Sequence, residues 1–160
     1  METARPAGPA DRPELRRMWE LAVAELDGQR GGSLLAGALT RPDPDTFLTE
    51  ALSDPDRLLV LGFIDDVPVG MGSACVERNR REPVTNLELL FTEPDARQVG
   101  VGAAMVEVVA EWGSSRGAVG VDAPALPGNR SAKAFFEAQG FQARLLIMHR
   151  PEGGPARVGG

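Results

Sequence analysis

Helical and strand-like hydrophobic patterns follow one another along the chain, separated by turns rich in Gly and Pro. The first long pattern covers residues 12–26, where apolar residues recur every three or four positions, as on one face of a helix. Asp11, followed by Glu14, gives this helix a start that resembles a capping box. A second helix is expected near residues 45–53, and Glu2–Ala7 is typical of an edge strand. The N-terminal third therefore predicts a strand followed by two helices.

The middle of the chain predicts three neighbouring strands. Leu58–Ile64 is apolar at successive positions, as in a strand that is buried on both faces. The pair Asp65-Asp66 predicts a tight turn into a return strand over Val67–Glu77. After a polar loop, Asn86–Thr92 predicts a third central strand.

The C-terminal half alternates helices with short strands. A helix is expected to begin at Gly100–Gly102 and to stop at Gly113 or Gly117. A short strand over Ala118–Asp122 follows it, and then a helix from an Asn129 cap to Ala138 that ends at Gly140. Beyond this helix, the sequence predicts a last strand over Leu145–Arg150 and a disordered tail over residues 151–160.

This order of elements predicts one domain over residues 1–150, of the α/β (α+β) class, with a mixed and mostly antiparallel sheet covered by helices. The length of 160 residues suits a single domain. A net charge of −6 argues against nucleic acid as the partner, and no apolar run is long enough to span a membrane. One cysteine, Cys75, and one histidine, His149, cannot assemble a metal tetrad, and we expect a cytoplasmic protein without a metal.

The most informative motif for chemistry is Arg97-Gln98-Val99-Gly100-Val101-Gly102, which lies between a strand and an amphipathic helix. Main-chain N–H groups at a helix start, with small residues around them, form a site for an anion such as a pyrophosphate, and Arg97 can add a charged contact. The alternative is that the glycines merely turn a strand into a helix. The motif lacks the Gly-Lys-Ser/Thr of a Walker loop, and Met105 stands where a Rossmann fingerprint has its third glycine.

A second motif combines Asn129, Ala132 and Phe136 with Gly140-Phe141. With this spacing, and with Leu87–Gly102 before it, the chain resembles the GCN5-related N-acetyltransferase (GNAT) family over about residues 2–150. Arg97, Gly100 and Gly102 match the family's Arg/Gln-x-x-Gly-x-Gly/Ala pattern. The resemblance implies a fold with about four helices and an acyl-CoA wedge between the fourth and fifth strands.

The resemblance also implies which residues bind the co-substrate, which is acetyl-CoA in most of the family. Leu90, Phe91 and Thr92 would pair with the pantetheine arm, and Asn129 would face the pantetheine or the phosphates. The pyrophosphate would lie on the main-chain amides of the segment after Arg97, which comprises Gln98, Val99, Gly100, Val101, Gly102 and Ala103.

Acetyl transfer to an amine requires a proton acceptor, and Glu88 is the first candidate. Period-two counting places Glu88 on one strand face with Leu90 and Thr92, and Glu77 and His149 are the alternatives. The family often has Tyr as general acid at the position of Phe136, but this chain contains no tyrosine. A non-catalytic acyl-CoA-binding module therefore stays open as an alternative, and so does an unrelated nucleotide-binding domain.

The acceptor is expected to be a small-molecule or peptide amine, and the acidic total charge favours a cationic one. The resemblance places the acceptor site between residues 28–40, 78–83 and 148–150. Arg97, Arg130 and Lys133 are expected to make the phosphate end of the site positive despite the total charge. The short C-terminal strand region leaves a sheet edge open, which favours a homodimer.

Overall fold

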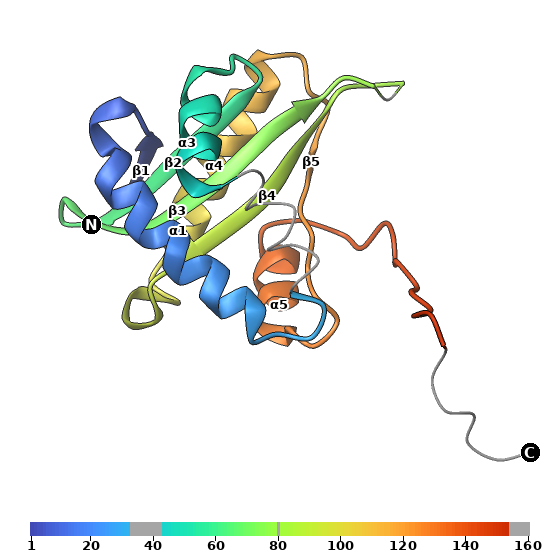
Figure 1. Cartoon of the computed structure of the whole chain (residues 1–160). Coiled ribbons are helices and arrows are strands. Elements are labelled where there is room, and N and C mark those ends of the chain that lie inside the picture. Colours follow the sequence, from blue (N-terminus) through green and yellow to red (C-terminus); the bar gives the residue numbers. More distant parts are fainter. Residues whose placement is uncertain (33–42, 80, 154–160) are drawn as a thin grey trace, which may run out of the picture.

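The computed structural model describes residues 1–32, 43–79 and 81–153 (Figure 1). Five strands form one sheet in sequence order. The strands are β1 (Glu2–Pro6), β2 (Arg57–Ile64), β3 (Val67–Glu77), β4 (Val84–Thr92) and β5 (Val121–Asp122). All neighbouring strands are antiparallel except β4 and β5, which are parallel. The predicted mixed, mostly antiparallel sheet is therefore confirmed.

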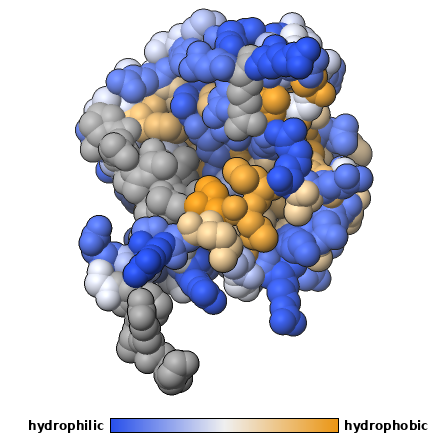
Figure 2. All heavy atoms as spheres, turned by 90° about the vertical axis from the view of Figure 1, so that its right-hand side faces the viewer, coloured by the Kyte–Doolittle hydropathy of each residue, from blue (hydrophilic) through white to orange (hydrophobic). Residues whose placement is uncertain are grey.

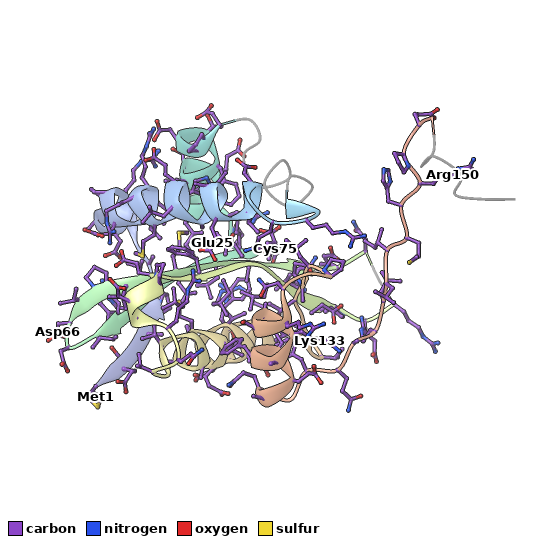
Figure 3. The ribbon with its side chains drawn as sticks, turned by 90° about the horizontal axis from the view of Figure 1, so that it is seen from below. Met1, Glu25, Asp66, Cys75, Lys133 and Arg150 are labelled. Atoms are coloured by element: carbon purple, nitrogen blue, oxygen red, sulfur yellow. The ribbon has the colours of Figure 1, made fainter. Side chains whose placement is uncertain are left out.

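The helices lie on both faces of this sheet and make three layers (Figure 3). They are α1 (Arg12–Asp27), α3 (Pro44–Ser53), α4 (Val101–Ser115) and α5 (Arg130–Ala138), with 3-10 turns at Pro9–Asp11 and Pro94–Ala96. Helices α1 and α3 cover one face, where the Trp19 and Phe47 rings pack with centroids 4.3 Å apart. Helix α4 covers the other face through Val101, Met105 and Val109, all of which are buried.

The expected turns have the backbone that their residues favour. Asp65 and Asp66 both have positive φ, 45° and 68°, as a tight hairpin between β2 and β3 requires. Of the two glycines proposed to end the third predicted helix, Gly117 is the one with left-handed φ (85°), and it follows α4 directly. Gly140 ends α5 in the same way, with φ of 90°.

Three expectations about the elements are wrong. Leu145–Arg150 forms no strand, since its backbone bonds to none of the described strands. The strand expected over Ala118–Asp122 is confined to its last two residues. The Asp11 carboxylate does not cap α1, because it accepts instead from the Gly8 amide at 2.9 Å and from the Arg5 guanidinium. Residues 33–42 and 154–160, which were also considered in the sequence, lie outside the described residues.

A β-bulge interrupts β4 at Glu88, the residue predicted to accept a proton. Ser73 of β3 faces Leu89, whereas the next residue of β3, Ala74, faces Leu87, so Glu88 is an extra residue in β4. Leu87 consequently packs in the cluster under α4, and Leu89 packs in the cluster under α1. Two residues that period-two counting puts on one face therefore lie on opposite faces.

Candidate functional site

Strands β4 and β5 pair only at their beginning and then diverge. The ladder joins Thr85 to Val121 and Asn86 to Asp122, and no described strand pairs with that edge of β4 beyond Asn86. A cleft of about 100 Å³ lies at the divergence. Its walls come from α1, β4, the loop after β5, and α5: Ala22, Glu25, Leu26, Gln29, Leu87, Glu88, Leu89, Leu90, Phe91, Pro124, Ala125, Leu126, Asn129, Ala132 and Phe136. The wedge expected between the fourth and fifth strands is therefore present.

The turn before α4 presents unpaired main-chain donors. Gly100 has φ of 102°, a left-handed conformation that strains any other residue, and Gln98 also has positive φ (66°). Within the described residues, Ala104 is the first residue of α4 whose N–H bonds to a protein acceptor, and that acceptor is the Gly100 carbonyl at 3.0 Å. The N–H groups of the first helical turn are thus available to an anion, and the helix dipole favours negative charge there.

Direct packing joins the two sequence motifs. A Cβ atom on Gly102 would lie 3.1 Å from the Phe135 ring of α5, so this glycine allows α4 and α5 to approach closely. The neighbouring Phe136 lines the cleft, and its ring packs between Phe135 and Phe141 with centroid distances of 5.3 and 5.1 Å. Direct packing therefore connects the start of α4, with its amides, to the wall of the cleft that α5 forms.

Asn129 has the capping role that its position predicts, and a second contact. Its side-chain oxygen accepts from the Ala132 amide at 3.0 Å, and its side-chain nitrogen donates to Gln29 Oε1 at 3.3 Å. The second contact links the start of α5 to the residues that follow α1, across the mouth of the cleft. Asn129 thereby fixes the width of the cleft at this point.

Glu88 lines the cleft inside a cluster of side-chain donors. Its carboxylate forms an ion pair with Arg57 and accepts from Ser73 Oγ at 3.2 Å and from Cys75 Sγ at 3.4 Å. The Arg57 guanidinium in turn lies 5.2 Å from the centroid of the Phe47 ring, in the layer of α1 and α3. The ion-paired side chains are mostly buried, with 22% and 25% of their surface exposed.

The face predicted for Glu88 is wrong. Leu90 packs in the cluster under α4, whereas the Glu88 carboxylate pairs with Arg57, whose guanidinium lies over the Phe47 ring on the opposite side of the sheet. The bulge is the physical reason, because an extra residue reverses the alternation of side chains at that point.

Cys75 is an unreactive thiol at neutral pH. Burial and the nearby Glu88 carboxylate both disfavour the thiolate and raise the pKa of Cys75 to about 12. Figure 3 shows Cys75 inside the molecule, between the sheet and α1. Its role here is therefore that of a hydrogen-bond donor to Glu88.

The basic residues expected at the phosphate end are mostly engaged elsewhere. Arg97 donates to the Thr92 carbonyl at 2.8 Å and forms an ion pair with Glu25 of α1, with its guanidinium 5.8 Å from the centroid of the Phe91 ring. Lys133 forms an ion pair with Glu137 at 3.7 Å. The anion site at the start of α4 therefore depends on main-chain donors more than on these side chains.

The structure brings only part of the expected site together. Glu88, Leu90, Phe91 and Asn129 line the cleft, and the segment from Gln98 to Ala103 forms the adjoining turn and helix start. Thr92 contributes its carbonyl to Arg97. The cleft is not lined by residues 78–79, 81–83 or 148–150, which were expected at the acceptor site. It is not lined by Glu77 or His149 either, the alternative candidates for the proton acceptor.

Sequence reasoning missed Glu25 as a wall of the cleft. Ala22, Glu25, Leu26 and Gln29 all line it, and they follow the i, i+3, i+4, i+7 spacing of one helix face. That spacing is the signal by which Glu25 could have been found.

Two further observations concern metal ions and membranes. Among the described residues, no group of three or more His, Cys, Asp or Glu side chains is arranged to hold a metal ion. None of the described helices is long and apolar enough to cross a membrane.

Comparison with known proteins identifies the family. Residues 15–141 match the Acetyltransferase (GNAT) family, and no curated protein matches by sequence. A solved structure of AAC(6')-Iy, in complex with the bisubstrate analogue CoA-S-monomethyl-acetylneamine, superposes with a TM-score of 0.73 at 20% identity over 95% of this chain and 99% of that one. Glucosamine-6-phosphate N-acetyltransferase from Arabidopsis thaliana gives 0.68 at 18% identity over 95% and 99%.

An aminoglycoside acetyltransferase, meta-AAC0020 from an uncultured soil metagenomic sample, in complex with sisomicin, gives a TM-score of 0.69 at 17% identity over 92% and 93% of the two chains. These likenesses show the fold, and the family match covers most of the sequence. The chain belongs to the acetyltransferase (GNAT) family.

Proposed function

We propose that the protein transfers an acetyl group from acetyl-CoA to a primary amine by direct attack within a ternary complex. The observation that carries this proposal is the open edge of β4 beyond Asn86, next to the unpaired amides at the start of α4. An extended pantetheine arm requires main-chain partners along a strand, and a pyrophosphate requires clustered N–H donors. Both requirements fit this part of the chain.

The residues proposed to hold acetyl-CoA follow from that fit. Leu90, Phe91 and Thr92 are assigned to the pantetheine arm: Leu90 and Phe91 line the cleft together with Asn129, and Thr92, whose carbonyl accepts from Arg97, follows them along β4. The six residues from Gln98 to Ala103 receive the pyrophosphate. A main-chain N–H near Leu90 donates to the oxyanion that forms at the acetyl carbon, and the co-substrate supplies the activated thioester.

We assign proton removal from the amine to Glu88, acting directly or through one water. Its carboxylate lines the cleft, and Arg57, Ser73 and Cys75 hold it in one position. Phe136 stands where the family often has a tyrosine and cannot donate a proton, so the departing thiolate takes its proton from solvent. Much of the rate gain then comes from holding the two reactants together.

The acceptor class is a cationic amine, either a small molecule or a peptide. The net charge of −6 favours a cationic acceptor by steering, whereas the two carboxylates on the cleft walls, Glu25 and Glu88, are ion-paired with Arg97 and Arg57. Structural neighbours include aminoglycoside acetyltransferases, one of them in complex with sisomicin. A cytoplasmic location fits the single cysteine of the sequence, which cannot form an internal disulfide.

The second candidate is a module that binds acyl-CoA without catalysis. Phe136 and the absence of tyrosine from the sequence favour it, and so does the engagement of the Glu88 carboxylate by Arg57. An acetyl-transfer assay across amine classes separates the two candidates, because the module binds CoA and turns over no amine.

Gly100→Glu tests the co-substrate site, since it places a bulky carboxylate where the pyrophosphate should bind. We expect CoA affinity, measured by calorimetry, to fall at least about tenfold from charge repulsion alone. Gly117→Glu is the matched control, because Gly117 has a similar φ (85° against 102°) at the opposite end of the same helix and open space around it. Equal CoA affinity in the two variants would refute the site.

Glu88→Gln tests the proposed base. We expect kcat to fall by roughly 10²–10⁴-fold, the usual contribution of a positioned base, while CoA affinity stays unchanged. Glu50→Gln, which neutralises an exposed carboxylate on α3 outside the cleft, should keep normal kcat. A Glu88→Gln enzyme with normal kcat would exclude Glu88 as the base.

A further inference from the structure

Arg97 joins the turn before α4 to the wall of the cleft. Its Nε atom donates to the Thr92 carbonyl at 2.8 Å, and its Nη2 atom forms an ion pair with Glu25 of α1. Figure 3 shows Glu25 between α1 and the sheet. Arg97 also precedes the segment from Gln98 to Ala103, which is proposed to receive the pyrophosphate. A carboxylate of the cleft wall therefore holds the cation that is next in sequence to the proposed anion site.

The ion pair between Arg97 and Glu25 is open to competition from a bound anion. The two side chains are 42% and 35% exposed, so solvent reaches both and screens their attraction. A phosphate group offers the guanidinium shorter and stronger charge-assisted hydrogen bonds, often two in parallel. A diphosphate bound at the turn can therefore draw Arg97 away from Glu25.

The size of the cleft also indicates that this contact changes. Its volume is about 100 Å³, whereas clefts that bury small ligands usually have roughly 300–1,000 Å³. The cleft lies on the side of the molecule that carries α5, where Figure 2 shows hydrophilic side chains around a hydrophobic patch. Two contacts that hold the α1 wall are the pair of Glu25 with Arg97 and the hydrogen bond of Gln29 with Asn129. The pantetheine arm needs this wall to move, and release of Glu25 makes that movement easier.

We propose that Arg97 changes partner when the acyl donor binds, an inference that rests on the proposed function. In the free protein its guanidinium pairs with Glu25, and in the complex it pairs with the pyrophosphate of the donor. Glu25 is then left on the cleft wall without its cation. An uncompensated carboxylate there attracts an ammonium group, so the donor complex favours a cationic amine more than the free protein does. The exchange thus accounts for a cationic acceptor although both wall carboxylates are paired in the free protein.

The affinity of a set of variants for CoA, measured by calorimetry at low ionic strength, tests the exchange. Glu25→Gln should bind CoA about two- to fivefold more tightly than the wild type, because Arg97 no longer has to leave a carboxylate. The same change made in Arg97→Gln should have an effect at least about twofold smaller, because no guanidinium remains to be released. Glu20→Gln is the matched control, since it removes the same charge from α1 and breaks an ion pair with Arg16 outside the cleft. This control should leave the CoA affinity unchanged.

The outcomes separate the exchange from the donor site. Equal CoA affinity of Glu25→Gln and the wild type would show that Arg97 keeps Glu25 in the complex, and would overturn the exchange. An equal gain with and without Arg97 would assign the gain to repulsion between Glu25 and the phosphates, and would overturn the exchange as well. A wild type that does not bind CoA would refute the donor site of the proposed function, and the exchange with it.

Turnover tests the part assigned to the released Glu25. With the amine that the acetyl-transfer assay finds to be the best acceptor, Glu25→Gln should raise the KM of the amine at least about threefold and change kcat by less than about twofold. The reason is that Glu25 attracts the amine without contacting the reacting atoms. Glu20→Gln should keep the wild-type KM. An unchanged KM in Glu25→Gln, or a protein that turns over no amine, would overturn this part, and the CoA affinities would still decide the exchange.

Discussion

At the scale of single residues, the pair formed by Arg57 and Glu88 is the one, among the ion pairs of the described residues, in which both side chains are at most 25% exposed. Its side chains are 22% and 25% exposed, whereas those of Arg78 and Asp56 are 46% and 43% exposed. A partner removed from a mostly buried pair leaves an uncompensated charge in a poorly solvated place, but solvent compensates at the surface. The Arg57–Glu88 pair should therefore contribute more to the free energy of unfolding than the Arg78–Asp56 pair.

Arg57→Met is expected to lower the free energy of unfolding by about 1–3 kcal/mol, since Glu88 loses its cation while Ser73 and Cys75 remain. Arg78→Met, at the exposed pair, should cost at most about 1 kcal/mol. Urea denaturation of both variants measures the difference. Equal losses would show that solvent screens Glu88 as well as it screens Asp56.

Residue identity alone could not predict this cluster. The sequence gives Glu88 in an apolar strand, and its period-two position suggested a face shared with Leu90. The extra residue in β4 is a property of the pairing with β3, since it depends on which residue of β3 stands opposite, and a single strand carries no record of that register. The partners of Glu88, which are Arg57, Ser73 and Cys75, lie on two other strands. Their contacts with Glu88 could not be predicted for the same reason.

At the scale of elements, the path of α4 over the sheet depends on close backbone approach. A Cβ atom on Gly113 would lie 1.9 Å from Thr85 Oγ1, a distance that real contacts do not reach. Thr85 is the β4 residue that pairs with Val121, so Gly113 packs α4 against the short region where β4 and β5 are joined.

Gly113→Ala is expected to lower the free energy of unfolding by about 1–3 kcal/mol, although alanine has the higher helix propensity, because the methyl group overpacks a fully buried contact. Thermal unfolding measures the effect. Gly120→Ala is the control, since nothing lies within 4 Å of a Cβ there, and it should change stability by no more than about 0.5 kcal/mol. A neutral Gly113→Ala would mean that α4 can shift at no cost.

Elements with strong local signals were predicted well, and those that depend on partners were not. The helices around Trp19 and Met105 and the hairpin at Asp65-Asp66 follow from periodicity and turn chemistry. Leu145–Arg150 has strand composition but lacks a partner within the chain as described, so its local preference alone did not make a strand.

At the scale of the whole molecule, acetyl-CoA binding should appear as added stability. A ligand at a hundred times its dissociation constant adds about 2.7 kcal/mol if it binds only the folded state. For a chain of 160 residues, this corresponds to a rise in Tm of roughly 5–10 °C. ATP at the same concentration should give a much smaller rise, because it lacks the pantetheine arm that we propose binds along β4. A larger rise with ATP would favour the unrelated nucleotide-binding alternative.

The amides between Gln98 and Ala103, which have no protein acceptor among the described residues, also have a consequence for how such a protein can evolve. Main-chain donors persist when side chains are replaced, provided that the left-handed glycine at 100 keeps the turn in shape. If these amides bind the pyrophosphate as proposed, mutation can change most of the surface around the cleft, and with it the choice of amine, without loss of the binding site for the acyl donor. Solved structures that share only 17–20% identity with this chain have the same fold.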